Sequence, residues 1–486
     1  MPRARDTRMN KIATGSIALV LSALVLSAFL SPAFAQDNAV STKQYDDGGI
    51  YKGTFRNGVQ HGTGTYTLPN GYEYSGEWID GEIKGKGRAV FPNGSVYEGD
   101  FEKGKPHGVG EVTYPDGGTY KGDWREGEIT GEGVLNYANG ARYEGGFLKG
   151  RHNGLGIMTN SDGYTYDGNW IEGKKQGLAK ITYPDGAIYE GNVENGIRQG
   201  QGMVKMPDGM IFEGAWVNGQ ITGQGKLVQP NGDVYEGELV NGRRQGEGRV
   251  VYANGDIYEG GFLDDLHHGQ GRVSGQDGYS YDGTWDKGKR QGEGTETYSD
   301  GSTYTGSFVD GIADGKGKIN YPDGSSYEGD WLKGIIEGKG TAIYPNGITY
   351  EGSFKNARIE GYGVMTYASG YTYEGNWKAS ARHGQGKATF PDGMIYEGEY
   401  KNGERDGKGK LALPDGFSYE GDWDQGEMTG FGRATYSNGD VYEGSFVKGK
   451  RQGEGKMTFS NGDTSTGTWQ NGDLVSTPED GVVRDN

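Results

Sequence analysis

The chain has 486 residues, of which 96 are glycine, 49 are Lys or Arg and 67 are Asp or Glu, and its net charge is −18. It has no cysteine, which excludes disulfides, thiolate metal sites and a cysteine nucleophile. So acidic a chain is a poor partner for nucleic acid, yet its 34 Tyr, 15 Phe and 9 Trp are more than disordered segments carry. The glycines and rings must therefore follow a pattern that builds an ordered core.

Residues 1–35 have the order of a secretory signal peptide. Four basic residues lead into an apolar run, residues 12–30, and Ala33-Phe34-Ala35 supplies a small-x-small ending. Cleavage after Ala35 removes those four basic residues and Asp6, which changes the net charge from −18 to −21. We expect an exported protein in the periplasm of a bacterium. The alternative is an inner-membrane anchor formed by an uncleaved run of residues 12–30.

From residue 51 a unit of 23 residues recurs without insertion or deletion. Each unit begins with an aromatic residue, from Tyr51 to Tyr442, and offsets are counted from that residue as zero. Gly occupies offsets 2, 11 and 20 in all 18 units, and offset 13 in all but the unit with Ala179. A short linker, 36–50, precedes the array, which spans 51–472 with a degenerate last unit. The acidic residues 473–486 are expected to form a disordered tail.

Two alternating runs in each unit predict two β-strands. Offsets 0, 2 and 4 alternate with polar residues, as in 97–101, and offsets 11 to 17 do the same, as in 108–114. A polar loop at offsets 6–10 separates them, and a turn such as Pro-Asp-Gly at 115–117 leads to the next unit. Each unit is thus predicted to be a β-hairpin. The array is predicted to be an all-β, elongated, twisted, single-layer antiparallel meander of about 18 such hairpins, preceded by an N-terminal signal helix.

The pattern also predicts how the strands pair. If offset 4 faces offset 11, then offset 2 faces 13 and offset 0 faces 15. At the next junction, offset 17 would face the following Tyr and offset 13 the following offset 4. Each aromatic residue at offset 4 would then lie between two glycines, which leave room for its ring. A bulge in either turn would change this register.

The succession Tyr-Glu-Gly-x-Trp/Phe, Asn-Gly or Lys-Gly, Gly-x-Gly and Tyr-Pro-Asp-Gly resembles the MORN (membrane occupation and recognition nexus) repeat, for example at 97–117 and 419–439. The resemblance covers residues 51–472. It implies a curved, single-layer sheet with aromatic residues in a groove, acting as a scaffold, a protein-binding platform or a dimerisation module. Phospholipid binding has also been proposed for the family. The chain has no room for the kinase domain that accompanies such arrays in plant phosphatidylinositol phosphate kinases.

Two sets of residues are candidates for partner binding. One is an aromatic groove, whose rings pack the sheet and also offer surface to a partner: Tyr97, Phe101, Tyr120, Trp124, Tyr166, Trp170, Trp216, Trp285, Trp331, Trp377 and Trp423. The other is a basic rim at the hairpin loops, set against aspartates at the inter-unit turns: Lys103, Lys105, Lys174, Lys175, Arg243, Arg244, Lys289, Arg290, Lys450 and Arg451. The opposite face, with Glu at offset 1 in many units, is expected to be solvated.

No motif indicates catalysis. The sequence lacks a Gly-x4-Gly-Lys phosphate loop and a calcium loop, and its carboxylates are spread evenly. The six histidines fall in the predicted hairpin loops, and we expect a metal site at none of them. We therefore predict a non-enzymatic, exported scaffold or adaptor without a cofactor, which binds proteins, a second copy of itself among them, and no nucleic acid. The alternative is an envelope-binding module for lipid or cell-wall glycan, although the charge of −21 disfavours anionic lipid.

Overall fold

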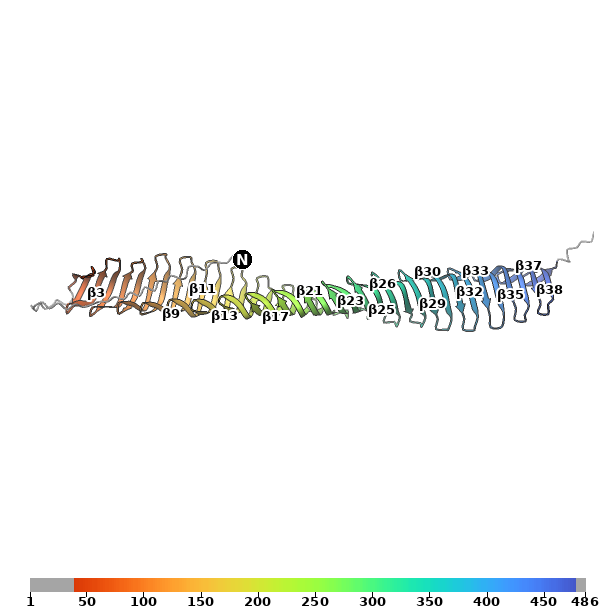
Figure 1. Cartoon of the computed structure of the whole chain (residues 1–486), viewed down its shortest axis with the longest axis horizontal. Helices are drawn as coiled ribbons and strands as arrows, with labels where there is room; N and C mark the ends of the chain where they lie inside the picture. Colours follow the sequence, from red (N-terminus) through yellow and green to blue (C-terminus); the bar gives the residue numbers. More distant parts are fainter. Residues whose placement is uncertain (1–38, 478–486) are drawn as a thin grey trace, which may run out of the picture. The chain divides into compact units, whose positions relative to one another are not determined.

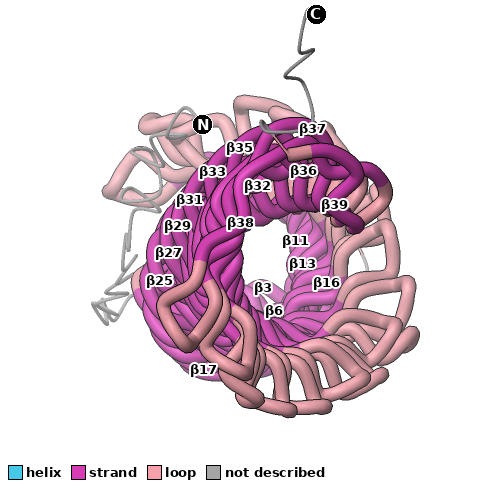
Figure 2. Tube along the Cα trace, turned by 90° about the vertical axis from the view of Figure 1, so that its right-hand side faces the viewer, coloured by secondary structure: helices cyan, strands magenta, loops and turns pink. Residues whose placement is uncertain are grey.

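The computed structural model describes residues 39–477, so the predicted signal helix and the end of the predicted tail lie outside the described residues. All regular secondary structure within residues 39–477 consists of β-strands (Figure 1). The strands are joined by turns at their ends (Figure 2). No helix in this range is long and apolar enough to cross a membrane. The chain divides into two compact units, Met1–Arg243 and Arg244–Asn486, and the same hairpin builds both.

The first unit is an antiparallel meander in which each strand pairs with the next one along the chain. Its strands are β1 (Ser41–Gln44), β2 (Ile50–Arg56), β3 (Val59–Thr67), β4 (Glu73–Ile79), β5 (Glu82–Val90), β6 (Val96–Glu102), β7 (Lys105–Thr113), β8 (Thr119–Arg125), β9 (Glu128–Asn136), β10 (Arg142–Leu148), β11 (Arg151–Thr159), β12 (Thr165–Ile171), β13 (Lys174–Thr182), β14 (Ile188–Glu194), β15 (Ile197–Lys205), β16 (Ile211–Val217), β17 (Gln220–Val228) and β18 (Val234–Val240).

The second unit begins within β19 and continues the same pairing rule to β39. Its strands are β19 (Arg243–Val251), β20 (Ile257–Leu263), β21 (Leu266–Ser274), β22 (Ser280–Asp286), β23 (Lys289–Thr297), β24 (Thr303–Val309), β25 (Ile312–Asn320), β26 (Ser326–Leu332), β27 (Ile335–Ile343), β28 (Thr349–Lys355), β29 (Arg358–Thr366), β30 (Thr372–Lys378), β31 (Ala381–Thr389), β32 (Ile395–Lys401), β33 (Glu404–Ala412), β34 (Ser418–Asp424), β35 (Glu427–Thr435), β36 (Val441–Val447), β37 (Lys450–Thr458), β38 (Thr464–Gln470) and β39 (Asp473–Ser476).

The hairpin predicted for each unit is confirmed, but its loop is shorter than the sequence indicated. In the hairpin of β6 and β7, Glu102 pairs with Lys105, which leaves a loop of two residues, Lys103 and Gly104. Both have positive φ, 52° and 77°, as a type I′ turn requires. The second strand therefore starts at offset 8, and offsets 8–10 belong to the strand rather than to the loop.

The predicted register is right for two pairs of each hairpin and wrong for the third. Tyr97 faces Val112 and Gly99 faces Gly110, but Phe101 faces Pro106, at offset 9, instead of Gly108 at offset 11. The pairing shifts after Gly99 because the second strand carries three residues, 107–109, where the first has Asp100 alone. Gly108 adopts φ 65° in this bulge, a conformation that glycine allows. The Asp100 carboxylate accepts the Val109 N–H at 3.2 Å.

The junction between units is also shifted by two residues from the prediction. The following Tyr120 faces Val112 at offset 15, and Trp124 faces Gly108 at offset 11. The reason is the turn at Pro115-Asp116-Gly117, where the Tyr114 N–H donates to the Gly118 carbonyl at 2.8 Å. Offset 17 is thus paired within the turn and cannot reach the following Tyr. The Asp116 carboxylate accepts the Gly118 N–H at 2.9 Å and holds the turn.

Rings do lie over gaps made by glycine, but the ring is the Tyr at offset 0 and not the aromatic residue at offset 4. A Cβ added to Gly110 would overlap the hydroxyl and ring of Tyr97. At Gly99 it would lie 2.5 Å from the Gly110 Cα. The Tyr97 hydroxyl donates to the Asp100 carbonyl at 2.9 Å, and the residue is fully buried. The paired glycines at offsets 2 and 13 therefore make room for the ring at offset 0, except beside Tyr166, where Ala179 replaces the second glycine.

The ends of the array extend further than the 51–472 boundaries indicated. Residues 41–44, expected in the linker, form β1 and pair with β2. Residues 473–476, expected in a disordered tail, form β39, in which Leu474 faces Trp469. Each end of the described chain thus covers the edge of a full hairpin with one short strand, which limits the exposed edge to four residues.

Candidate functional site

One face of each unit, here called the aromatic face, is built from offsets 0, 4, 9 and 15 and is filled by its own rings. The Tyr97 ring centre lies 5.0 Å from that of Phe101 in the same hairpin and 5.1 Å from that of Trp124 in the next, both edge to face. The Trp124 Nε1–H donates to the Gly110 carbonyl at 3.2 Å. Such edge contacts are favoured by the ring quadrupole, and their repetition links each hairpin to its neighbour.

The structure places the eleven predicted groove residues in this ladder. Ten of them are between 0 and 9% exposed, and Trp124 is half-buried. These rings are therefore the core of a one-layer sheet. Their further role, contact with a partner, stays a prediction.

The ten predicted rim residues divide into two groups. Those at offsets 6 and 8 are exposed at the hairpin ends: Lys103, Lys105, Lys174, Arg243, Lys289 and Lys450. Carboxylates share these ends, since Lys289 Nζ lies 2.8 Å from Asp310 Oδ1 and Arg56 Nη2 lies 2.6 Å from Asp80 Oδ1. The hairpin ends are therefore of mixed charge.

The four rim residues at offset 9, Lys175, Arg244, Arg290 and Arg451, turn onto the aromatic face instead. The Arg451 guanidinium lies 4.3 Å from the Trp469 ring centre, and its Nη2 donates to the Gly472 carbonyl in the next hairpin. Lys175 Nζ lies 4.9 Å from the Tyr166 ring centre. These cations stack on rings, which is favourable when they are partly desolvated. The three arginines also donate to a carbonyl in the loop of the next hairpin, whereas Lys175 donates to the Tyr164 hydroxyl.

A polar contact at offset 10 was missed by the sequence analysis. Side chains at this offset accept the N–H of the positive-φ residue in the next hairpin loop, as Gln291 Oε1 does from Asp310 at 3.0 Å and His61 Nδ1 from Asp80 at 3.3 Å. Gln, His, Asp and Glu can all act as the acceptor, and Asp314 and Glu337 are examples of the carboxylates. The signal was present as a run of acceptors spaced 23 residues apart. The histidines accordingly lie on strands and not in loops.

Two histidines at offset 9 are stacked inside the aromatic face. The His152 ring lies 3.7 Å from the Tyr143 ring centre and the His267 ring 3.6 Å from that of Tyr258, both nearly parallel. Burial, assisted by the nearby cations Lys175 and Arg244, respectively, lowers the pKa of each histidine to about 4. Both imidazoles are therefore neutral at pH 7.

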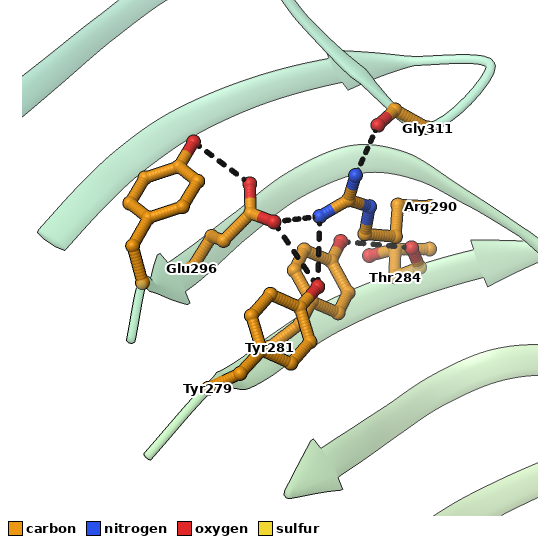
Figure 3. Close-up of polar contacts among 7 residues, drawn as sticks. Tyr279, Tyr281, Thr284, Arg290, Glu296 and Gly311 are labelled. Carbon is orange, nitrogen blue, oxygen red and sulfur yellow. Dashed lines mark hydrogen bonds and ion pairs between the residues drawn. The ribbon is translucent and has the colours of Figure 1, made fainter. Parts of the chain in front are cut away.

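One hairpin replaces the apolar residue of offset 15 by a carboxylate. Glu296 is 5% exposed and forms an ion pair with Arg290. Its two oxygens also accept the hydroxyls of Tyr279 and Tyr298, each at 3.0 Å, and Arg290 donates onward to the Gly311 carbonyl (Figure 3). Burial, opposed by Arg290 and assisted by Glu296, raises the pKa of Tyr279 to about 12. Every carboxylate oxygen here has a donor, so the cluster is closed to an added ligand.

The opposite face, here called the charged face, carries offsets 1, 3, 12 and 14 and is solvated, as predicted. Basic residues at offset 14 pair with Glu at offset 1 of the next hairpin, as in Lys180–Glu190 at 3.0 Å and Lys318–Glu328 at 3.1 Å. Basic residues at offset 12 pair with Asp at offset 3, as in Lys86–Asp100 at 2.7 Å, where Lys86 holds the pKa of the Asp100 carboxyl below its usual range. Glycines at offsets 2 and 13 lie between these two rows.

The comparison with family models matches the MORN repeat in eighteen successive segments between residues 51 and 464. The chain belongs to the MORN repeat family. The matched segments begin at the aromatic residue of offset 0 in every unit, which is Tyr except at Phe212, so the MORN unit is the hairpin described above plus the turn that follows it. The MORN match indicates a repeat scaffold with a binding role and no enzymatic family. Among residues 39–477, no group of three or more His, Asp or Glu side chains is arranged to hold a metal ion.

A comparison with curated proteins found no match. Solved structures similar to this MORN array include the TCP domain of SAS-4 from Drosophila melanogaster in complex with a proline-rich motif of Ana2, at 16% identity and a TM-score of 0.20, covering 44% of this chain and 97% of that one. The TCP10 domain of Danio rerio CPAP in complex with a STIL peptide has 15% identity and a TM-score of 0.18, covering 56% and 98%. Virginiamycin B lyase from Staphylococcus aureus has 12% identity and a TM-score of 0.11, covering 65% and 83%. At these TM-scores they say nothing of a partner or an activity of this chain.

Proposed function

We propose that this MORN array is a non-enzymatic, exported scaffold or adaptor that binds protein partners, a second copy of the chain among them. The observation that supports the proposal is the difference between the two faces, one of which is buried and the other exposed to solvent. The rings of the aromatic face are buried against their own glycines, so each hairpin holds its shape without a second layer of structure. The charged face and the hairpin ends, repeated along both units, are left to meet other molecules.

Export is the second part of the proposal. It rests on the basic start, the apolar run 12–30 and the Ala33-Phe34-Ala35 ending. N-terminal sequencing of the protein from a periplasmic fraction tests it. A chain that starts at Gln36 supports export with cleavage, retention in the inner membrane supports the anchor formed by residues 12–30, and a full-length chain in the cytoplasm contradicts both.

Crosslinking in intact cells, followed by identification of the crosslinked proteins, tests the scaffold function. We expect defined protein partners or a crosslinked dimer, and the dimer is checked on purified protein by light scattering. A chain that stays monomeric and recovers no specific protein contradicts the proposal.

The alternative function is an envelope-binding module for lipid or cell-wall glycan. Apolar side chains exposed on the charged face support this alternative, because they offer surface to an acyl chain or a sugar ring. Leu155, Leu178 and Phe431, all at offset 12, are 76, 73 and 64% exposed. Liposome flotation and sedimentation with peptidoglycan separate this function from the scaffold. Clear binding to either, in the absence of crosslinked proteins, would replace the scaffold proposal.

A further inference from the structure

The charged face of the second unit contains a groove that crosses the strands from β23 to β29. It has a volume of about 1080 Å³. Its floor is the row of paired glycines at offsets 2 and 13, such as Gly340 facing Gly352. One wall is the row of offsets 1 and 14, and the other is the row of offsets 3 and 12. Six strand spacings make the groove roughly 29 Å long.

Three of the six charged side chains that line this groove are matched within their own wall, and Glu293, near the β23 end, accepts the Ser307 hydroxyl instead of an ion pair. Lys318 pairs with Glu328 at 3.1 Å in one wall, and Lys316 pairs with Asp330 in the other. These pairs join β25 to β26. They are the local examples of the pairing that repeats over the whole charged face.

The next junction, between β27 and β28, breaks the pattern in both walls at once. Lys339 faces Ser353 where the preceding junction has Asp, and Glu351 faces Thr341 where the preceding junction has Lys. Both charged side chains are exposed, and neither forms an ion pair within residues 39–477. A cation and an anion without an ion pair therefore stand on opposite walls, on either side of the floor pair Gly340 and Gly352. Lys316 is the ion-pair partner of Asp330 and lowers the pKa of that carboxyl, and Lys339 helps to lower it without pairing with Asp330.

The groove has the repeat of a polyproline II helix. Two strands per hairpin give a repeat of about 9.6 Å along the groove, and three residues of polyproline II advance about 9.3 Å. A peptide in that conformation therefore meets equivalent wall residues once per turn, and about nine residues fill the groove. Its carbonyls need donors, which the lysines and threonines of the walls supply. At the β29 end Tyr362, 55% exposed, offers the kind of aromatic surface on which prolines dock.

We propose that this groove binds an extended, proline-rich peptide of a partner protein that carries one basic and one acidic residue, the acidic one meeting Lys339 and the basic one Glu351. This inference rests on the proposed scaffold function and names its partner class. The two charges belong one or two positions apart, because Lys339 and Glu351 lie on adjacent strands about 4.8 Å apart and polyproline II rises about 3.1 Å per residue. A neutral glycan would leave both wall charges unmatched, so the charges favour the peptide.

Fluorescence anisotropy with a labelled nine-residue peptide, Pro-Pro-Pro-Arg-Pro-Glu-Pro-Pro-Pro, tests the proposal on the full-length mature protein. We expect saturable binding, and binding at least about tenfold weaker when the flanking prolines are replaced by glycine, because the ordering cost then rises. Lys339→Glu and Glu351→Lys should each weaken binding by about tenfold. Glu351→Lys should also come to prefer a peptide in which Glu replaces Arg, a change of specificity that misfolding cannot produce. Lys387→Glu is the matched control, because it makes the same charge change on exposed β31 outside the groove.

Three results would overturn the proposal: no binding of the peptide, equal binding of the glycine peptide, or equal effects of the groove variants and Lys387→Glu. Binding of soluble peptidoglycan fragments that is lost in the same two variants would overturn it in favour of a glycan ligand. The scaffold proposal fails separately. If the protein captures cellular partners but does not bind the peptide, the scaffold proposal stands and the groove proposal is contradicted. If the protein binds the peptide but captures no cellular partner, the groove proposal is supported and the scaffold proposal is contradicted.

Discussion

The half-buried Arg290 forms an ion pair with the buried Glu296, which stands at offset 15, where the other hairpins of the array have an apolar residue. Because a carboxylate left without its cation in such a site is costly, we expect Arg290→Ile to lower the local free energy of unfolding by about 3 kcal/mol. Other hairpins carry Ile at these two offsets, as Ile336 and Ile319. Replacing both Arg290 and Glu296 by Ile should therefore lower the local free energy of unfolding by no more than about 1 kcal/mol. Hydrogen exchange of β22 to β25 measures both. A double variant as unstable as the single one would contradict the account.

The two glycines beneath one Tyr ring are predicted to differ in their tolerance of alanine. At Gly99 an added Cβ meets backbone, the Gly110 Cα at 2.5 Å and the Val109 carbonyl oxygen at 2.7 Å, whereas at Gly110 it meets only the movable Tyr97 side chain among its three nearest atoms. The chain already tolerates an alanine at the second position, Ala179.

Gly99→Ala should therefore destabilise the β6–β7 hairpin by about 2–3 kcal/mol and Gly110→Ala by about 1 kcal/mol. Hydrogen exchange of this hairpin is the suitable measurement, because a long repeat array does not unfold in two states. Equal losses, or a larger loss at Gly110, would show that the ring and not the backbone limits the approach of the strands.

Stability should fall between about pH 6.5 and pH 4 because of His152 and His267. Their pKa in the folded chain is about 4, below the 6.5 of a free histidine, so the unfolded state binds more protons in this window and folding weakens as the pH decreases. The loss at the acid end is about 3 kcal/mol for the buried His152 and smaller for the half-buried His267, where solvent screens the charge.

His152→Ile and His267→Ile, which copy Ile129 at the same offset, should remove the pH dependence of hydrogen exchange in β11 and β21. His383, on β31, is the control, since substitution of this half-buried residue should leave the exchange of β11 and β21 unchanged. Persistence of the acid loss in the double variant would assign it to carboxylates instead.

The sequence was sufficient to predict the hairpins, the meander and the MORN family, since strict spacing of Tyr and Gly leaves little freedom for another fold. It was not sufficient for the register. The bulge at Gly108 and the short loop at Lys103 depend on backbone conformations that glycine permits but does not require, and together they move the partner of Phe101 by two residues. The turn that follows Tyr114 moves the pairing at the junction by two residues as well.

The same error explains the misassigned rim. With the loop taken as offsets 6–10, Arg451 was expected at a solvated edge. The strand in fact begins at Lys450, and simple alternation then turns Arg451 onto the Trp469 ring. The unmatched pair Lys339 and Glu351 could not be predicted either, because it appears only when the true register sets Lys339 against Ser353.

The claim that the aromatic face is the interior of a one-layer sheet is tested most directly by hydroxyl-radical footprinting of the tyrosines in the native protein. Tyr97, Tyr120 and Tyr166 are fully buried, and Tyr362 is 55% exposed. We predict oxidation of Tyr362 and protection of the other three until the protein is unfolded. Oxidation of Tyr97, Tyr120 and Tyr166 at the rate of Tyr362 in the folded chain would contradict the account.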